Sequence, residues 1–196
     1  MKSLINKFLK HRALTTFQKN CVFGERFSCG IKARCFNESN KEKITLGSNN
    51  QICGTLIVTG KGKITIGNNV TVRPHSQISS SNSIQIGNEV IISNNVTIMD
   101  NNSHPISPAF RRRMSLEGPE GKLWSASYAE SSPIIIHDNV WICERSVILK
   151  GVEIGEGSIV ACDSIVTHNV PPYVIVAGNP AKVVKEIKKD EEDSVC

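Results

Sequence analysis

The sequence predicts an all-β fold, a three-sided parallel β-helix, and three observations carry this prediction. Fifteen aliphatic residues recur every six positions along the chain. The side chain four positions after each of them is usually small. Aromatic residues make up only 5% of the chain, which suits a core built from thin stacked layers. The fifteen aliphatic residues are Leu46, Ile52, Val58, Ile66, Val72, Ile78, Ile86, Ile92, Ile98, Ile136, Ile142, Ile148, Ile154, Val160 and Val166.

The period of six defines the shape of the coil. It fits neither the 3.6-residue period of an α-helix nor the two-residue period of a simple strand. Three short faces, each with one inward aliphatic side chain, explain it, and successive turns then stack at about 4.8 Å. Leu46, Ile66 and Ile86 are 20 positions apart and later turns repeat every 18, so the early turns hold two extra residues at a corner.

Glycine follows an inward aliphatic residue in several turns of the predicted coil. The positions include Gly47, Gly67, Gly87 and Gly155. A glycine is needed where the backbone adopts a positive φ or where another backbone approaches closely. The sequence leaves these two explanations open.

The repeat breaks between His104 and Pro133. This interval is polar and irregular, and it predicts a long inserted loop over 105–132. It contains Phe110, the run Arg111–Arg113 and Trp124. Long insertions in a regular scaffold are usually functional, so the loop is a candidate site.

The ends of the coil need covers because they expose unpaired backbone groups. Residues 1–21 predict an N-terminal capping helix, and 22–178 form the β-helix domain. Residues 179–196 predict a second short helix, over 181–189, and a tail. The first helix carries Leu4, Ile5 and Phe8 beside many basic residues, so it is interpreted either as a lid or as a surface helix that touches anionic lipid.

Composition excludes several classes of protein. The net charge is +5, but five basic residues and no acidic ones lie within 1–21, so the rest of the chain is balanced and offers no nucleic-acid footprint. Seven cysteines without metal-type spacing favour reduced thiols. Residues 1–20 lack the apolar run of a secretion signal, so a cytoplasmic location is expected.

Three motifs in order carry a resemblance to a known family. They are Asn102-Ser103-His104-Pro105-Ile106, Asp138-Asn139-Val140-Trp141-Ile142 and Ala177-Gly178-Asn179-Pro180-Ala181-Lys182. With the repeats they resemble the hexapeptide-repeat acetyltransferases, whose fold is a left-handed parallel β-helix, over roughly residues 44–188. The branch is that of galactoside, maltose and xenobiotic acetyltransferases and surface-polysaccharide O-acetyltransferases. The resemblance implies acetyl-CoA as co-substrate, no metal, and a homotrimer with active sites between subunits.

His104 stands one hexad beyond Ile98, where an aliphatic residue was due. Spacing alone leaves a structural and a catalytic histidine equally open, and the resemblance implies catalysis. A neutral imidazole can accept the proton of an attacking hydroxyl, which accelerates such reactions by about 10²–10⁴. The other ring nitrogen needs an acceptor, and Asp100, Asn102 or a backbone carbonyl could provide it.

The resemblance also implies the coenzyme A contacts. Trp141 would form a wall for the pantetheine arm, although packing on a neighbouring subunit would also explain an outward tryptophan. Pantetheine amides would lie near Cys143 and Ala161; both cysteines of the late repeats, Cys143 and Cys162, are interpreted as packing residues rather than acyl carriers. The phosphate end would meet Thr167, His168, Asn179, Lys182 and Lys185, and a solvated helix face is the alternative for the two lysines.

The acceptor contacts are less specific. Galactoside-binding members carry an Asn and an Asp before the catalytic histidine, whereas the matching region here offers Arg73 and His75 without a carboxylate. The candidate acceptor residues are Arg73, His75, Asp100, Asn102, Arg111 and Trp124. The arginines would suit an acidic sugar or a diphosphate carrier. A solvated loop or an intersubunit salt link explains the arginine run as well.

The sequence therefore predicts acetyl transfer from acetyl-CoA to a sugar hydroxyl, in a ternary complex, with His104 as general base. The acceptor would belong to a bacterial surface polysaccharide or its precursor. An acetyltransferase for a small amino sugar or xenobiotic is the alternative, and a non-enzymatic β-helix is a third. Zinc hydratases of this fold need three converging histidines, and the five histidines here include no close pair.

Overall fold

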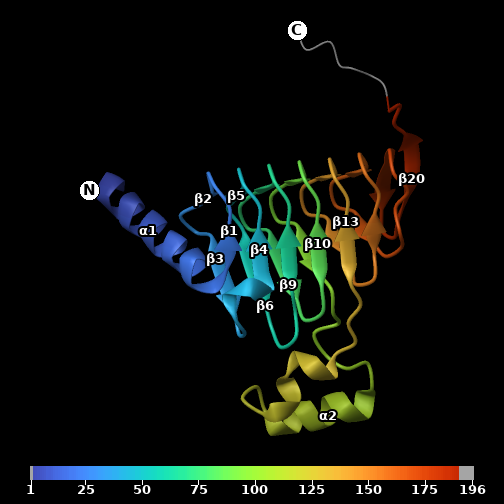
Figure 1. The fold of residues 1–196 in the computed structure, drawn as a ribbon. Helices are drawn as coiled ribbons and strands as arrows, with labels where there is room; N and C mark the ends of the chain where they lie inside the picture. Colours follow the sequence, from blue (N-terminus) through green and yellow to red (C-terminus); the bar gives the residue numbers. More distant parts are fainter. Residues whose placement is uncertain (1, 190–196) are drawn as a thin grey trace.

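Three parallel sheets enclose a triangular coil in the computed structural model, which describes residues 2–189 and side chains from Leu4 onward (Figure 1). The first sheet contains β1 Val22–Phe23, β4 Ile44–Leu46, β7 Ile64–Ile66, β10 Ile84–Ile86, β13 Ile134–Ile136 and β16 Glu153–Ile154. The second contains β2 Ser28–Cys29, β5 Gln51–Ile52, β8 Thr71–Val72, β11 Ile91–Ile92, β14 Trp141–Ile142, β17 Ile159–Val160, β19 Val174–Gly178 and β20 Ala181–Glu186. The third contains β3 Arg34–Asn37, β6 Thr55–Val58, β9 Gln77–Ser80, β12 Thr97–Met99, β15 Val147–Ile148 and β18 Ile165–Val166.

The six-residue repeat forms the core, as predicted. All fifteen aliphatic residues of the repeat are buried. In the first sheet Ile66 pairs with Ile86, and Ile86 pairs with Ile136, so the coil resumes in register after the inserted segment. Because each inward side chain stacks on the equivalent one of the next turn, the core is a continuous aliphatic column. The parallel three-sided coil is thus confirmed, and its left-handed sense stays a prediction.

The repeat glycines are explained by close approach of neighbouring turns. A Cβ atom on Gly67 would lie 2.7 Å from the backbone of Gly87, and one on Gly47 would lie 2.7 Å from the backbone of Gly67. The positive φ angles fall instead two residues later, with 61° at Asn49 and 58° at Asn69. Asparagine tolerates this conformation better than most residues. Each of these corners therefore uses two residues: a glycine that allows neighbouring turns to approach closely, and an asparagine that adopts the positive φ of the bend.

Replacing Gly67 by alanine is therefore expected to lower the free energy of unfolding by about 1–3 kcal/mol, because the added methyl group must displace the backbone of the next turn. Urea denaturation followed by circular dichroism measures the change. The matched control is Gly60→Asn, since Gly60 has a φ of 56° and open space around its Cβ position. Equal losses in both variants would show that turn spacing is not what requires Gly67.

The N-terminal helix α1, Lys2–Asn20, covers the first turn of the coil with its C-terminal half (Figure 1). Ala13 and Phe17 are buried, and the Phe17 ring lies 5.1 Å from that of Phe27. The predicted capping helix is present. Its first turns do not contact the coil, because Leu4 and Phe8 are exposed.

The predicted C-terminal helix over 181–189 is wrong. The chain turns at Asn179–Pro180, a cis peptide bond, and Ala181–Glu186 forms strand β20, antiparallel to β19. Valines 183 and 184 are β-branched and favour a strand, and pairing with β19 satisfies backbone groups at the last edge of the second sheet. The predicted tail, 190–196, lies outside the described residues.

The inserted segment is not an irregular loop but a small helical arm beside the coil (Figure 1). It contains α2 Pro108–Glu117 and the 3-10 turns η2 Lys122–Trp124 and η3 Ala126–Tyr128; a further turn, η1 Lys41–Lys43, lies in an early coil. Ser107 caps α2 by accepting from the backbone N–H of Phe110, and Pro108 opens the helix. Within the described part of the chain, no helix is long and apolar enough to cross a membrane.

Candidate active site

Asp100 anchors the point where the arm leaves the coil. Its carboxylate is fully buried and accepts from the Ser80 hydroxyl at 2.6 Å and from the backbone N–H groups of Ser81 and Asn82, each at 2.9 Å. The side chain of Asn101 also donates to it. Asp100 was predicted to contact either the acceptor sugar or the imidazole of His104. Its oxygens are committed to the corner of the preceding turn, so we assign it a scaffold role.

The neck of the arm places His104. Asn101 and Ser131 form a β-bridge, and the backbone N–H of Asn102 donates to the carbonyl of Glu130 at 2.9 Å. The backbone N–H of His104 then donates to the carbonyl of Asn102 at 2.7 Å. Asn102 therefore holds the backbone of His104 and not its ring. No hydrogen bond to the imidazole is present among residues 2–189.

The arm folds back over His104. The side chain of Arg111 makes two hydrogen bonds to the turn after the histidine. Its Nη1 donates to the carbonyl of Pro105 at 3.1 Å and to that of Ile106 at 2.5 Å. The Trp124 ring meets the imidazole edge-on at 5.2 Å between centroids. Its Nε1 donates to the carbonyl of Met114 at 3.0 Å, which locks the indole onto α2.

These side chains enclose a pocket of about 190 Å³ lined by His104, Arg111, Met114, Ser115 and Trp124. The imidazole of His104 is exposed at its wall. A base, a cation and an aromatic ring therefore face one small space, which suits the binding of a sugar hydroxyl. Sequence reasoning missed Met114 and Ser115. The Ser107-Pro108 start signal could have predicted α2, and with it the helical face that brings both residues to the pocket.

Two predicted acceptor residues lie elsewhere on the chain. Arg73 and His75 follow β8 at a corner of the coil, and both are exposed. His75 lines a hollow of about 320 Å³ together with Pro74 and residues of the earlier turns. Within one chain this hollow is separate from the pocket of His104, so Arg73 and His75 do not join that site.

The predicted pantetheine residues lie in the second sheet. Trp141 is exposed on β14 and donates from Nε1 to the Ser93 hydroxyl at 3.2 Å. The backbone N–H groups of Cys143 and Ala161 each donate to the next turn at 2.9 Å. Because these donors are occupied, a ligand's amide groups could meet only the carbonyls of both residues, and that of Ala161 also accepts from the Ser146 hydroxyl at 2.9 Å. Trp141 and His104 lie on different faces of one chain.

The predicted phosphate-end residues gather at the last turns. The Thr167 hydroxyl and Nδ1 of His168 are 2.8 Å apart. The backbone N–H of Gly178 donates to the Ser164 hydroxyl at 3.1 Å, which brings the hairpin turn with Asn179 beside the corner before β18. Lys182 and Lys185 are exposed on β20. Their predicted helix is absent, but their charges remain at this end of the coil.

Cys143 does not have the properties of an acyl carrier. Burial, with a smaller contribution from Cys162, raises the pKa of its thiol to about 11. Cys162 is exposed, so core packing does not explain it. We expect iodoacetamide at pH 7.5 to label Cys162 within minutes and to leave Cys143 unmodified in the folded protein, as peptide mass spectrometry would show, because thiolates are the reactive form. Rapid labelling of Cys143 would contradict this and make an acyl-cysteine intermediate possible.

A hollow of about 480 Å³ lies on the outer side of the last turns and is lined by His137, Glu153 and Glu156 among others. Nε2 of His137 and Oε1 of Glu153 are 2.7 Å apart, and both side chains are about half exposed. Because it lies away from the arm and His104 does not line it, we do not place the chemistry there. Among residues 2–189 no three His, Cys, Asp or Glu side chains gather as a metal site.

Coil and arm define the class of protein, a hexapeptide-repeat protein with a histidine at the point of insertion. Residues 133–168 match the family model described as bacterial transferase hexapeptide (six repeats). The resemblance to the hexapeptide-repeat transferases is confirmed. Curated relatives include 2,3,4,5-tetrahydropyridine-2,6-dicarboxylate N-acetyltransferases of Clostridium perfringens and Staphylococcus aureus, each 48% identical over 62 residues, or 32% of this chain. The chain spans about a quarter of those relatives, 26% of their length.

Solved structures share the fold over most of the chain. A variant of AntD, an N-acyltransferase from Bacillus cereus in complex with dTDP and coenzyme A, aligns with a TM-score of 0.69 at 20% identity, covering 90% of this chain and 89% of its own. The polySia-specific acetyltransferase NeuO aligns with a TM-score of 0.69 at 25% identity, covering 88% of this chain and 70% of its own.

Proposed function

We propose that this protein transfers an acetyl group from acetyl-CoA to a hydroxyl of a sugar, with His104 as general base. The observation that carries the proposal is the exposed imidazole of His104 in a pocket with Trp124 and Arg111. Surface polysaccharides and their precursors are acceptors of this kind. The neighbours support the reaction class, since AntD is an N-acyltransferase solved with coenzyme A and NeuO is an acetyltransferase specific for polySia.

The chemical step needs one base and no covalent enzyme intermediate. His104 accepts the proton of the sugar hydroxyl while the oxygen attacks the thioester carbonyl. The tetrahedral intermediate collapses to the acetyl ester and expels the coenzyme A thiolate, which takes the proton back from the imidazolium. The proton and the acyl group are thus both accounted for in a ternary complex.

Coenzyme A would bind along the second sheet and be held by Trp141, the carbonyls of Cys143 and Ala161, and the last turns. Because Trp141 and His104 face different ways in one chain, we propose that a second copy completes the site, in the homotrimer that the resemblance implies. The exposed tryptophan then lies against the arm of a neighbour. Thr167, His168, Asn179, Lys182 and Lys185 would meet the phosphate end.

The alternative acceptor is an amine. It is favoured by AntD, which is an N-acyltransferase, and by the N-acetyltransferase names of the curated relatives. An amine acceptor would use the same His104 and the same coenzyme, so only the product separates the two possibilities.

The test is incubation with acetyl-CoA and matched pairs of sugars and amino sugars, with products analysed by NMR and mass spectrometry. The proposal predicts acetyl esters, which mild base removes. If the products contained only base-stable amides, the acceptor group would be an amine and not a hydroxyl. Release of free coenzyme A with no acceptor in the panel modified would contradict the proposed reaction.

A further inference from the structure

Arg111 places a fixed positive charge beside His104. Its Nη1 is held by the carbonyls of Pro105 and Ile106, and the side chain lines the same pocket as the imidazole. None of the ion pairs found among residues 2–189 includes Arg111, so no carboxylate of the described residues neutralises it. Nη2 and Nε keep three N–H donors for a ligand.

The two hydrogen bonds that hold the turn after His104 do not by themselves require a positive charge at position 111. A neutral donor of the same length would satisfy the same two carbonyls, and it would not add a cation to a pocket. A guanidinium with one nitrogen fixed is already oriented, so binding an anion costs little side-chain entropy. Planar N–H donors match the oxygens of a carboxylate or a phosphate.

The remaining walls suit the body of a sugar. The indole of Trp124 has its Nε1 occupied by Met114, so it presents an apolar face, and Met114 is apolar as well. Sugar rings pack their C–H faces on such surfaces, while Ser115 offers a hydroxyl. The pocket thus combines an apolar wall, a base and one unpaired cation.

We propose that the acceptor is an anionic sugar whose carboxylate or phosphate binds Arg111 while a hydroxyl of the same residue reaches His104. This inference rests on the proposed function and specifies its substrate class. Charge-assisted hydrogen bonds of this kind correspond to roughly a ten- to hundredfold preference over the neutral sugar.

The test compares neutral and acidic versions of one ring, namely glucose with glucuronic acid and glucose 6-phosphate, and the methyl ester of N-acetylneuraminic acid with the free acid. Binding is measured by saturation-transfer NMR titration without acetyl-CoA, and transfer is measured separately. The wild type is expected to bind one acidic member at least tenfold more tightly than its neutral partner. Comparing glucuronic acid with glucose 6-phosphate identifies whether a carboxylate or a phosphate is preferred.

Arg111→Gln removes the charge, so it is expected to abolish the preference. The matched control is Arg112→Gln, an exposed neighbour on α2 that does not line the pocket, and it should retain the preference. Equal affinity for neutral and acidic sugars in the wild type, or equal loss for both in Arg111→Gln, would overturn the inference. An acid preference without any acetyl transfer would contradict the proposed function alone.

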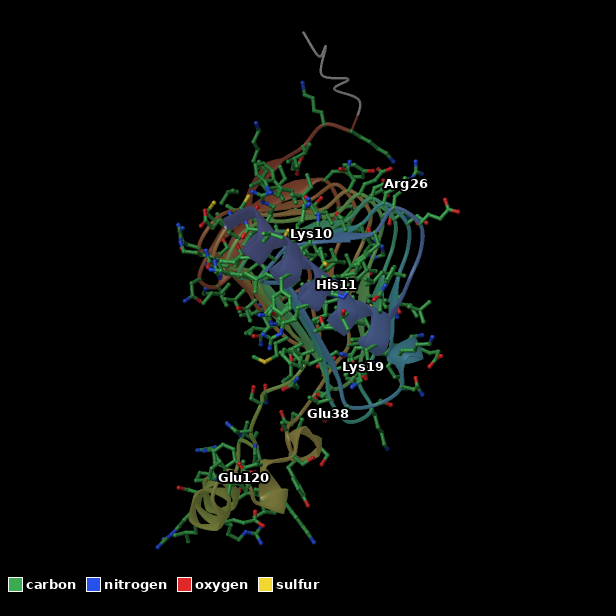
Figure 2. All side chains as sticks on the ribbon, turned by 90° about the vertical axis from the view of Figure 1, so that its left-hand side faces the viewer. Lys10, His11, Lys19, Arg26, Glu38 and Glu120 are labelled. Atoms are coloured by element: carbon green, nitrogen blue, oxygen red, sulfur yellow. The ribbon has the colours of Figure 1, made fainter. Side chains whose placement is uncertain are left out.

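A second surface lies on the first turns of α1. Leu4, Ile5 and Phe8 are 74%, 51% and 66% exposed. Phe8 precedes the buried Phe17 by nine residues, about 2.5 helical turns, so the two rings point to opposite sides of the helix. Leu4 and Phe8 therefore face away from the coil, and Ile5 lies at the side of the helix. Figure 2 looks onto this end, where α1 crosses in front of the coil with Lys10, His11 and Lys19 along it.

The charge around this apolar patch selects its partner. Residues 1–20 contain no acidic residue, and Lys7, Lys10 and Arg12 are exposed on the same part of α1. A second copy of α1 would bring like charges together, and a nucleic acid would leave the apolar side chains in water. An anionic membrane surface satisfies both the charges and the apolar residues. We infer that the first turns of α1 dock on such a surface.

Co-sedimentation of the full chain with vesicles tests this inference. Phosphatidylcholine vesicles containing phosphatidylglycerol are expected to bind at least tenfold more protein than pure phosphatidylcholine vesicles. The double variant Leu4→Ser, Phe8→Ser should lose this binding, whereas Leu116→Ser, which alters an exposed leucine on the arm, should not. Equal binding to both vesicle types, no binding, or self-association that depends on Phe8 would contradict membrane docking.

Discussion

Replacing His104 by glutamine is expected to lower kcat for acetyl transfer by about 10²–10⁴ and to leave the KM for acetyl-CoA nearly unchanged. Glutamine keeps a polar side chain at the wall of the pocket but cannot accept a proton at neutral pH. The arm should stay folded, because the backbone N–H of His104 still donates to Asn102 and the contacts of Arg111 are with Pro105 and Ile106. Steady-state kinetics with a thiol-detecting assay measures both constants.

His11→Gln serves as the control, since this exposed histidine lies on α1, far from the arm (Figure 2). Its kinetics should match the wild type. If His104→Gln transferred acetyl groups at the wild-type rate, the pocket would not be the reaction centre, and the large hollow beside His137 would become the next candidate.

Replacing Asp100 by alanine is expected to lower the free energy of unfolding by roughly 3–5 kcal/mol, because several donors lose an acceptor and each buried unpaired donor costs about 1–3 kcal/mol. The donors are the hydroxyl of Ser80 and the backbone N–H groups of Ser81 and Asn82. The same change loosens the start of the arm, so activity should fall with stability. Urea denaturation and kinetics at a fixed temperature measure the two effects.

The matched control is Asp163→Ala. Asp163 also accepts short hydrogen bonds, at 2.7 Å from Nε and Nη2 of Arg145, but this pair is exposed on the coil. Water screens exposed ion pairs, so little loss of stability is expected. Comparable losses in the two variants would mean that burial does not give Asp100 its importance.

The coil could be predicted because its signal is local and repeated. Each inward position, such as Ile92 or Ile142, carries the same requirement for a small aliphatic chain, and fifteen repetitions leave little freedom for another fold. The C-terminal strand could not be predicted in the same way. Strand β20 forms because β19 offers an unpaired edge, and that edge is a property of the assembled coil, not of residues 181–186.

The sequence could predict the histidine at the centre of the site, but not the residues that line the pocket around it. The break in the period located His104, but the pattern could not separate a carboxylate that binds a ligand from one that holds a corner, as Asp100 does. Met114 and Ser115 reach the pocket only because α2 folds back and Trp124 locks onto it. Arg73 and His75 were grouped with His104 by the family resemblance, whereas the coil carries them to another corner.

A crystal structure with coenzyme A and an acceptor sugar would show directly whether His104 is the general base. We expect the thiol of coenzyme A to lie in the pocket of Trp124, with an imidazole nitrogen of His104 within hydrogen-bond reach, about 2.6–3.2 Å, of one sugar hydroxyl. Trp141 from a second copy should lie along the pantetheine arm. Coenzyme A bound with its thiol remote from His104, or a sugar whose hydroxyls all point away from that imidazole, would rule out this role of His104.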